Sequence, residues 1–379
     1  MGLMDHLSSK ALRLGVPLSV HLDVTYRCNE RCEHCYLEHD DLGEMSTGEM
    51  RGLLQQLEQS GVFFLTISGG EPLVRRDCFE ILAMARSLGF NVKLKTNAIL
   101  VKEQQARKLH SLGVEQVQVS VYSHRPEVHD AITKVPDSLF RTVAGIRLLR
   151  SHGVKVTVAN VLMKSNFADA REVSALAREL GAHYTLDPTI TPMLNGDRSI
   201  LRLGLASNEV RSLFRDANLV GDVHAFCAPP PPIDDEAREG FPCSAGHTAC
   251  YVSPYGDVYP CVQFPLPCGN VRKETFLHIW RNSSQLREVR SIRGKDLPTC
   301  SSCAHLGTCT RCPGLAFMEG NMRGPSSADC EKSFLRTGLL TAGMQAHAAA
   351  SNTSATCGLV QIEGSQPSPV PAVTVARAL

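Results

Sequence analysis

One repeating pattern between residues 18 and 187 limits the folds open to this chain. Apolar, β-branched runs of four to nine residues alternate there with amphipathic stretches. The amphipathic stretches end at glycines, which readily adopt the left-handed conformation that terminates helices. These glycines are Gly61, Gly89, Gly113, Gly153 and Gly181. The expected strands are residues 18–24, 62–68, 91–96, 116–122, 154–162 and 183–186.

This alternation predicts an α/β fold in which parallel strands are joined by right-handed crossovers. Six units are too few for a closed eight-stranded barrel. The pattern therefore favours a partial (β/α)6 TIM-like barrel, with a doubly wound open sheet as the alternative. Ser46-x-x-Glu49 and Asp77-x-x-Glu80 are typical of helix starts.

The composition changes after residue 205 and predicts a second, Cys-rich region. A helix is expected at residues 207–217, and the Pro run after Cys227 is expected to form a stiff connection. The predicted organisation is an N-terminal extension (1–17), the partial barrel (18–225) and a Pro-rich linker (226–240). A small Cys-rich domain (241–335) with a hairpin near residues 252–262 follows, and residues 342–379 are expected to be a disordered tail.

The charge balance excludes some classes of partner. Lys and Arg total 39 against 38 Asp and Glu, so no global field attracts nucleic acid or an anionic membrane. No apolar run approaches about 18 residues, and residues 1–17 lack the apolar core of a signal peptide. We expect a cytoplasmic protein with no nucleic-acid or membrane partner.

The cysteines point to metal chemistry. An odd total of 15 cysteines without a secretion signal favours metal ligation over a disulfide framework. Cys28, Cys32 and Cys35 follow the first expected strand. Three thiolates on one loop can hold three corners of an iron–sulfur cube and leave the fourth iron open to another ligand. The alternative is a zinc site completed by His34.

The Cys28-x3-Cys32-x-His34-Cys35 pattern resembles the radical S-adenosylmethionine superfamily. The resemblance implies a [4Fe-4S] cluster with an open iron site, to which S-adenosylmethionine binds. His34 stands at the family's aromatic position beside the third cysteine. An external one-electron reductant, such as flavodoxin or ferredoxin, would drive cleavage of S-adenosylmethionine to a 5′-deoxyadenosyl radical that abstracts a substrate hydrogen. The sequence identifies no catalytic acid or base.

A second match follows the second expected strand, at Ser68-Gly69-Gly70-Glu71-Pro72. The resemblance implies that Gly69, Gly70 and Glu71 hold the methionine amine of S-adenosylmethionine, with Glu71 paired to the ammonium group. Weaker matches lie at the ends of later strands. Ser120 resembles a ribose-contacting position and Asn160 a second ligand-contacting position.

The cysteines of the second region resemble the SPASM extension of the same superfamily, which carries two auxiliary iron–sulfur clusters. This chain has two residues between the fifth and sixth cysteines, where the common motif has three. One implied cluster is held by Cys300, Cys303, Cys309 and Cys330. The other is held by Cys243, Cys261 and Cys312, with Cys227, Cys250 or Cys268 as a candidate fourth ligand.

The two CxxC pairs could alternatively hold one zinc ion. We expect Cys78 and Cys357 not to be ligands.

The resemblance implies an enzyme that oxidatively modifies a peptide or protein substrate, a peptide maturase. The alternatives are modification of haem or another tetrapyrrole, and a non-catalytic iron–sulfur or zinc scaffold. Residues 1–17 leave room for one short helix, and residues 331–379 have little apolar content. We therefore expect a separate protein to bind any leader peptide.

Overall fold

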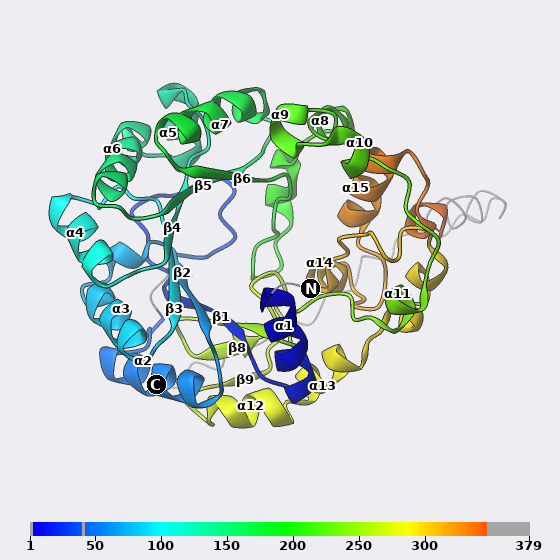
Figure 1. Cartoon of the computed structure of the whole chain (residues 1–379), viewed down its shortest axis with the longest axis horizontal. Coiled ribbons are helices and arrows are strands. Elements are labelled where there is room, and N and C mark those ends of the chain that lie inside the picture. Colours follow the sequence, from blue (N-terminus) through cyan, green and yellow to red (C-terminus); the bar gives the residue numbers. More distant parts are fainter. Residues whose placement is uncertain (1–2, 40–41, 347–379) are drawn as a thin grey trace, which may run out of the picture.

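The computed structural model describes residues 3–39 and 42–346 of the 379-residue chain, with helices surrounding a single curved sheet (Figure 1). The strands are β1 (Ser19–Thr25), β2 (Phe64–Gly69), β3 (Asn91–Thr96), β4 (Gln116–Ser120), β5 (Val156–Val161), β6 (His183–Asp187), β7 (Ala249–Val252), β8 (Asp257–Tyr259) and β9 (Gly269–Asn270). The helices of the first part are α1 (Leu3–Leu14), α2 (Thr47–Gln59), η1 (Pro72–Val74), α3 (Cys78–Ser87), α4 (Glu103–Ser111), α5 (Pro126–Thr133), α6 (Ser138–Ser151) and α7 (Ala170–Glu179). Those that follow are α8 (Ser207–Leu213), α9 (Ala217–Val220), α10 (Val223–Phe226), α11 (Asp235–Glu239), α12 (Phe276–Asn282), α13 (Ser284–Ser291), α14 (Pro313–Met318) and α15 (Ser327–Thr337).

The strand order distinguishes the two predicted topologies. Strands β1 to β6 are all parallel, and each lies beside its neighbour in sequence. A doubly wound sheet reverses its strand order at a switch point, and this sheet has no reversal among those strands. Helices α2 to α7 lie along the outer side of the curve (Figure 1). The partial (β/α)6 barrel is therefore confirmed, and the doubly wound alternative is wrong.

The predicted helix ends also agree with the structure. All five glycines have positive φ angles, between +64° at Gly113 and +86° at Gly61. Ser46 and Glu49 form a capping box at the start of α2. The second predicted start is different, because Asp77 makes no side-chain capping bond to α3. Its carboxylate instead accepts hydrogen bonds from Arg75 and Thr47.

The second region continues the barrel sheet. β7 pairs in parallel with β1, placing Val252 beside Leu22, and β7 and β8 form the predicted antiparallel hairpin. Val252 and Leu22 belong to one apolar core. The first and second regions therefore share a sheet and a core, and their predicted boundaries stay a prediction.

The predicted disordered tail lies outside the described residues from residue 347 onward. Among the helices that the structure describes, none combines the length and the apolar character needed to cross a bilayer.

Candidate active site

A cavity of about 530 Å³ opens at the carboxyl ends of the parallel strands. Functional sites of α/β barrels lie at this end because the loops that follow the strands converge there. The cavity gathers predicted residues from four separate segments of the sequence. These are Cys28, Cys32, His34, Cys35, Gly69, Gly70, Ser120 and Asn160.

The cysteine loop docks onto the end of α5. The Arg31 backbone N–H donates to the Thr133 carbonyl oxygen, and the Glu33 N–H donates to the Ile132 carbonyl oxygen, both at 3.0 Å. The Arg31 guanidinium also donates to the Cys28 carbonyl oxygen at 2.7 Å. Hydrogen bonds within the protein therefore hold this loop over the cavity.

Burial raises the pKa values of the three loop thiols, that of Cys28 to about 12. These groups are thus protonated at neutral pH unless a cation stabilises their thiolates. Iron supplies such a charge, and loading a cluster would release their protons. The three thiols on one cavity wall fit a cluster held by this loop.

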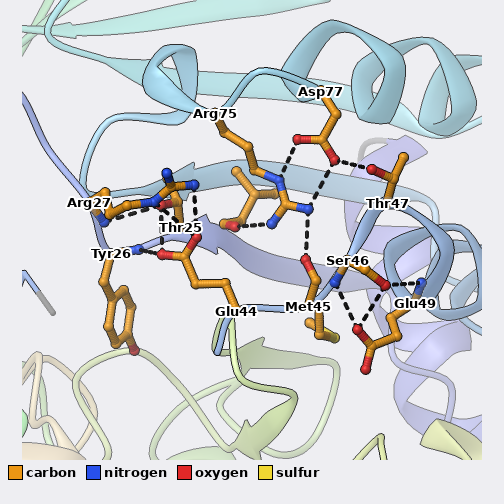
Figure 2. A network of polar contacts seen from close by, with 11 residues as sticks. Thr25, Tyr26, Arg27, Glu44, Met45, Ser46, Thr47, Glu49, Arg75 and Asp77 are labelled. Atoms are coloured by element: carbon orange, nitrogen blue, oxygen red, sulfur yellow. Dashed lines mark hydrogen bonds and ion pairs between the residues drawn. The ribbon is translucent and has the colours of Figure 1, made fainter. Parts of the chain in front are cut away.

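A second clamp fixes the segment that enters the cysteine loop (Figure 2). The buried Arg75 guanidinium donates to the carbonyl oxygens of Val24 and Met45, each at 2.7 Å, and also to Asp77. The Glu44 carboxylate accepts hydrogen bonds from the Thr25 hydroxyl and the Tyr26 N–H at 2.7 and 2.8 Å. The position of Cys28 therefore depends on residues as far along the chain as Asp77.

The two glycines after β2 are required by close backbone packing. A Cβ atom on Gly69 would lie 2.0 Å from the Thr25 carbonyl oxygen, and one on Gly70 would lie 2.5 Å from the Arg27 carbonyl oxygen. Gly69 also has a φ of +140°, which favours glycine. Both residues thereby bring the β2 loop against the segment before Cys28 and onto the cavity wall.

Glu71 lies directly behind the cavity wall. Its side chain is fully buried and does not line the cavity. Its carboxylate accepts hydrogen bonds from the Leu73 N–H at 2.9 Å, the Thr96 hydroxyl at 2.8 Å and the Asn97 N–H at 2.7 Å. Burial nevertheless raises its pKa to about 7, against the opposing effect of these donors. In this structure the Glu71 carboxylate braces the ends of β2 and β3. Its pairing with the ammonium group of S-adenosylmethionine stays a prediction.

The amide group of Asn160 is buried in the cavity wall. The residue is 1% exposed, and its amide lies near the Tyr184 hydroxyl without a well-formed hydrogen bond to any described residue. Buried polar atoms are normally paired because desolvating them without a partner is costly. Asn160 can both donate to and accept from a bound molecule. This pairing capacity fits S-adenosylmethionine, which carries several donors and acceptors.

A row of aromatic rings connects the cysteine loop with α5. The His34 and Tyr122 rings meet edge to face with centroids 4.7 Å apart, and Tyr122 stacks on His129 at 5.4 Å. Burial lowers the pKa of His34 to about 4, so its ring is neutral at physiological pH. His34 therefore presents an uncharged ring to the cavity, as its predicted position requires.

One lining residue that the sequence analysis did not single out is Glu30. Its side chain is buried within the cysteine loop, and its carboxylate accepts from the Cys32 thiol at 3.4 Å. Burial raises its pKa to about 7. The only feature in the sequence that could have identified Glu30 is its position between Cys28 and Cys32. The cysteine motif allows any residue at that position.

The second region contains another cavity, of about 640 Å³. Four thiols from three segments line it, which is the set predicted for one auxiliary cluster. They belong to Cys300, Cys303, Cys309 and Cys330. Burial raises the pKa of Cys300 to about 11, and the other three thiols add smaller contributions. The four thiols therefore lie around one space, which fits a shared cluster.

The other predicted set lies together as well. Burial is the main cause that raises the pKa of Cys261 to about 11, and Cys243 and Cys312 contribute. Of the three candidate fourth ligands, Cys250 is near enough to Cys261 for the two thiols to influence each other electrostatically, and the choice among the three stays a prediction. Cys227 contacts the Arg215 guanidinium at 2.6 Å and donates to the Phe214 carbonyl oxygen at 3.2 Å, whereas Cys250 and Cys268 lie in the main apolar core.

The two cysteines predicted not to be ligands are Cys78 and Cys357. Cys78 is buried in the main core on α3, and Cys357 lies outside the described residues.

Zinc is the alternative metal for the Cys28–Cys35 loop and for the two CxxC pairs. A structural zinc ion requires four ligands at about 2.0–2.3 Å. Within residues 3–39 and 42–346, no three His, Cys, Asp or Glu side chains converge closely enough to hold a single metal ion.

Two family models match this chain. The first, described as the radical SAM superfamily, matches residues 22–177. The second, described as an iron–sulfur cluster-binding domain, matches residues 243–304. The matches fall on the barrel and on the Cys-rich region.

Curated relatives cover most of the chain. The mycofactocin maturase of Mycobacterium tuberculosis is 31% identical over 81% of this chain and 81% of its own length. The AdoMet-dependent heme synthase of Methanosarcina barkeri is 28% identical over 79% of this chain and 92% of its own length.

Solved structures share the fold. Streptococcus suis SuiB bound to the precursor peptide SuiA superposes with a TM-score of 0.68 at 18% identity, covering 86% of this chain and 79% of that one. The anSMEcpe structure with bound AdoMet gives a TM-score of 0.62 at 17% identity, covering 89% of this chain and 96% of that one.

Proposed function

Because the chain belongs to the radical S-adenosylmethionine superfamily and carries a SPASM-type iron–sulfur region, we propose that it is a maturase that oxidatively modifies a peptide. Its cofactors are a [4Fe-4S] cluster, S-adenosylmethionine and auxiliary iron–sulfur clusters. When bound, the first two supply a 5′-deoxyadenosyl radical able to remove a hydrogen atom from a substrate. We propose Cys28, Cys32 and Cys35 as the ligands of the first cluster, and Asn160, Ser120, His34 and the Gly69–Gly70 backbone as contacts of S-adenosylmethionine.

The observation that carries this proposal is that the active-site cavity extends from the cysteine loop to the second region. Beyond the cysteine loop, it is lined by Val262 and Gln263, which directly follow Cys261. A substrate in the cavity can therefore contact the first region and the segment of an auxiliary ligand at once. Such a position suits a net oxidation, because an auxiliary cluster held by Cys261 would supply an acceptor for the electron left after hydrogen removal.

The end of the sheet favours an extended peptide as the substrate. Within the described residues β6 pairs only with β5, and its five residues are exposed or half-buried. Thr185, Leu186 and Asp187 of this strand line the cavity. An edge strand offers unpaired backbone groups to which an extended chain can bind by strand addition. A flat tetrapyrrole has no backbone to pair there.

Tetrapyrrole modification is the second candidate, favoured by the similarity to the heme synthases. One assay separates the two functions. The anaerobically reconstituted protein is incubated with S-adenosylmethionine, a reductant and either a precursor peptide encoded beside its gene or a porphyrin bearing propionate groups. We expect 5′-deoxyadenosine formation and a changed peptide mass. Product formation with the porphyrin alone would replace the peptide proposal.

Two partners complete the proposal. We propose that a flavodoxin or ferredoxin supplies electrons and that a separate small protein presents the leader of the peptide. A titration of the precursor peptide with and without such a protein tests the second point. Tight, leader-dependent binding by this chain alone would contradict it.

A further inference from the structure

Polar side chains enter the barrel from the middle of the sheet. On β3 and β4, Leu94, Val117 and Val119 are fully buried in the main core, whereas Lys95 and Gln118 line the active-site cavity. This follows from strand geometry, because successive side chains point to opposite faces. Lys95 therefore directs a long cationic side chain toward the space that a substrate would occupy.

The Lys95 ammonium makes no direct ion pair or hydrogen bond within the part of the chain that the structure describes. It is the only Lys or Arg among the described residues that line the cavity. Its side chain is half-buried. The other ends of the same cavity carry acidic groups, Glu30 in the cysteine loop and Asp187 at the end of β6.

An unpaired cation in this position is unfavourable without a ligand. Burial lowers the pKa of Lys95, whereas the Asp23 and Asp187 carboxylates act in the opposite direction. Removing an ammonium group from water without a partner costs free energy, which a bound anion restores through a charge-assisted hydrogen bond. The geometry thus suits an anionic group placed inside the cavity.

We propose that Lys95 is a specificity residue that binds a carboxylate of the substrate inside the barrel. This inference rests on the proposed function for the identity of the substrate. In a peptide the carboxylate is the C-terminus or an Asp or Glu side chain, and in a tetrapyrrole it is a propionate. All share the planar two-oxygen acceptor that an ammonium group can bind.

The first test needs no knowledge of the substrate. The holoprotein is treated with an acetylating reagent in the presence of propionate or of propionamide, and modification of each lysine is followed by mass spectrometry. We expect propionate, but not propionamide, to slow acetylation of Lys95. Lys93 is the internal control because it is exposed on the same strand and does not line the cavity. Equal rates at Lys95 with both compounds would overturn the proposal.

The second test asks whether Lys95 is the residue that recognises the carboxylate of the peptide. Binding of the precursor peptide is compared with binding of peptides in which one carboxylate at a time is replaced by an amide. In the wild-type protein, loss of the recognised carboxylate should weaken binding about 10- to 100-fold. In Lys95→Met the two peptides should bind equally, and Lys95→Arg should restore part of the difference. Lys93→Met, the matched control, should keep the wild-type discrimination.

A third titration distinguishes a failure of this inference from a failure of the proposed function. A propionate-bearing porphyrin and its methyl ester are titrated in the same way. Lys95-dependent discrimination for the porphyrin, with no peptide binding, would keep the role of Lys95 and overturn the peptide proposal. Equal weakening of every peptide in Lys95→Met would show a structural role. A loss confined to S-adenosylmethionine affinity would assign Lys95 to the cofactor carboxylate. Equal weakening of every peptide, or a loss confined to S-adenosylmethionine affinity, would overturn the inference.

Discussion

The two cysteine-bearing regions of this molecule reach their geometry by different means. The loop of Cys28, Cys32 and Cys35 follows a buried strand and is held by backbone hydrogen bonds to α5. The cavity of Cys300, Cys303, Cys309 and Cys330 is formed by short helices and loops together with the 11-residue helix α15, and none of these four cysteines follows a strand of the sheet. The first region can therefore position its ligands without metal. In the second, we expect metal ligation to supply a large part of the stability.

The largest expected effect tests this difference directly. Three four-iron clusters predict about 12 iron atoms and 12 sulfides per chain. Replacing Cys300 and Cys303 with Ala should remove about 4 irons and unfold the surrounding segment, because its thiols lose their common partner. Replacing Cys28, Cys32 and Cys35 with Ala should also remove about 4 irons and abolish 5′-deoxyadenosine formation, yet leave the barrel folded.

Iron analysis measures the metal content of each variant, limited proteolysis measures local unfolding, and thermal unfolding measures the stability of the whole protein. The comparison fails if both variants lose the same stability, or if the first variant keeps protease resistance across residues 294–346.

A buried arginine in the first region gives the next largest effect. Arg75→Met should lower the free energy of unfolding by about 3–5 kcal/mol, because Asp77 and two backbone carbonyls lose a buried donor. The matched control is Arg51→Met, since Arg51 pairs with Glu80 while both side chains are more than half exposed. That change should cost less than about 1 kcal/mol. Denaturant titration distinguishes the two, and equal losses would contradict the clamp.

A smaller effect depends on pH. The pKa of Glu71 is raised to about 7 by burial, so between about pH 4.5 and 7 the folded protein holds a proton that the unfolded chain has released. Stability should therefore fall as the pH rises through this range and level off above it. The change should be roughly 1–3 kcal/mol.

Glu71→Gln cannot ionise and should lack the Glu71 part of this slope, whereas Glu30, whose pKa burial also raises to about 7, should keep its own part. Unfolding free energies measured at several pH values check the difference between the two proteins. Parallel pH profiles for the wild type and Glu71→Gln would show that Glu71 stays ionised through folding.

Much of the first region was predictable because local patterns determine it. The strand–helix alternation and the glycines with positive φ identify the six parallel strands. Each predicted strand end lies within two residues of the observed one. The cysteine loop and Gly69–Gly70 were identifiable because their chemistry or packing demands a particular residue type. Pairing of β7 with β1 was not predictable, since a four-residue strand more than 220 residues away carries no local signal for its partner.

The orientation of single side chains was equally beyond the sequence. Glu71 lies next to two cavity-lining glycines, yet its carboxylate faces the Thr96 hydroxyl and the Asn97 N–H. Lys95 lies beside Thr96 on the same strand and faces the cavity. Which side of a strand faces the barrel interior depends on the pairing register, and a register is fixed only when all neighbouring strands are in place.

The smallest expected effect concerns how the two regions are joined. The Arg272 guanidinium reaches from the second region to the Glu49 carboxylate of α2 at 2.6 Å and to the Gly43 carbonyl oxygen at 2.8 Å. Both charged side chains are more than a third exposed, so solvent screens their attraction. Arg272→Ala should therefore lower stability by only about 0.2–1 kcal/mol, and high salt should reduce that difference.

The matched change at the buried junction is Val252→Ala. Val252 is fully buried on β7 beside Leu22 of β1, so its truncation should cost about 2 kcal/mol independently of salt. Denaturant titrations at low and high salt compare the two variants. If Arg272→Ala costs as much as Val252→Ala, surface charge and not the shared sheet joins the second region to the barrel.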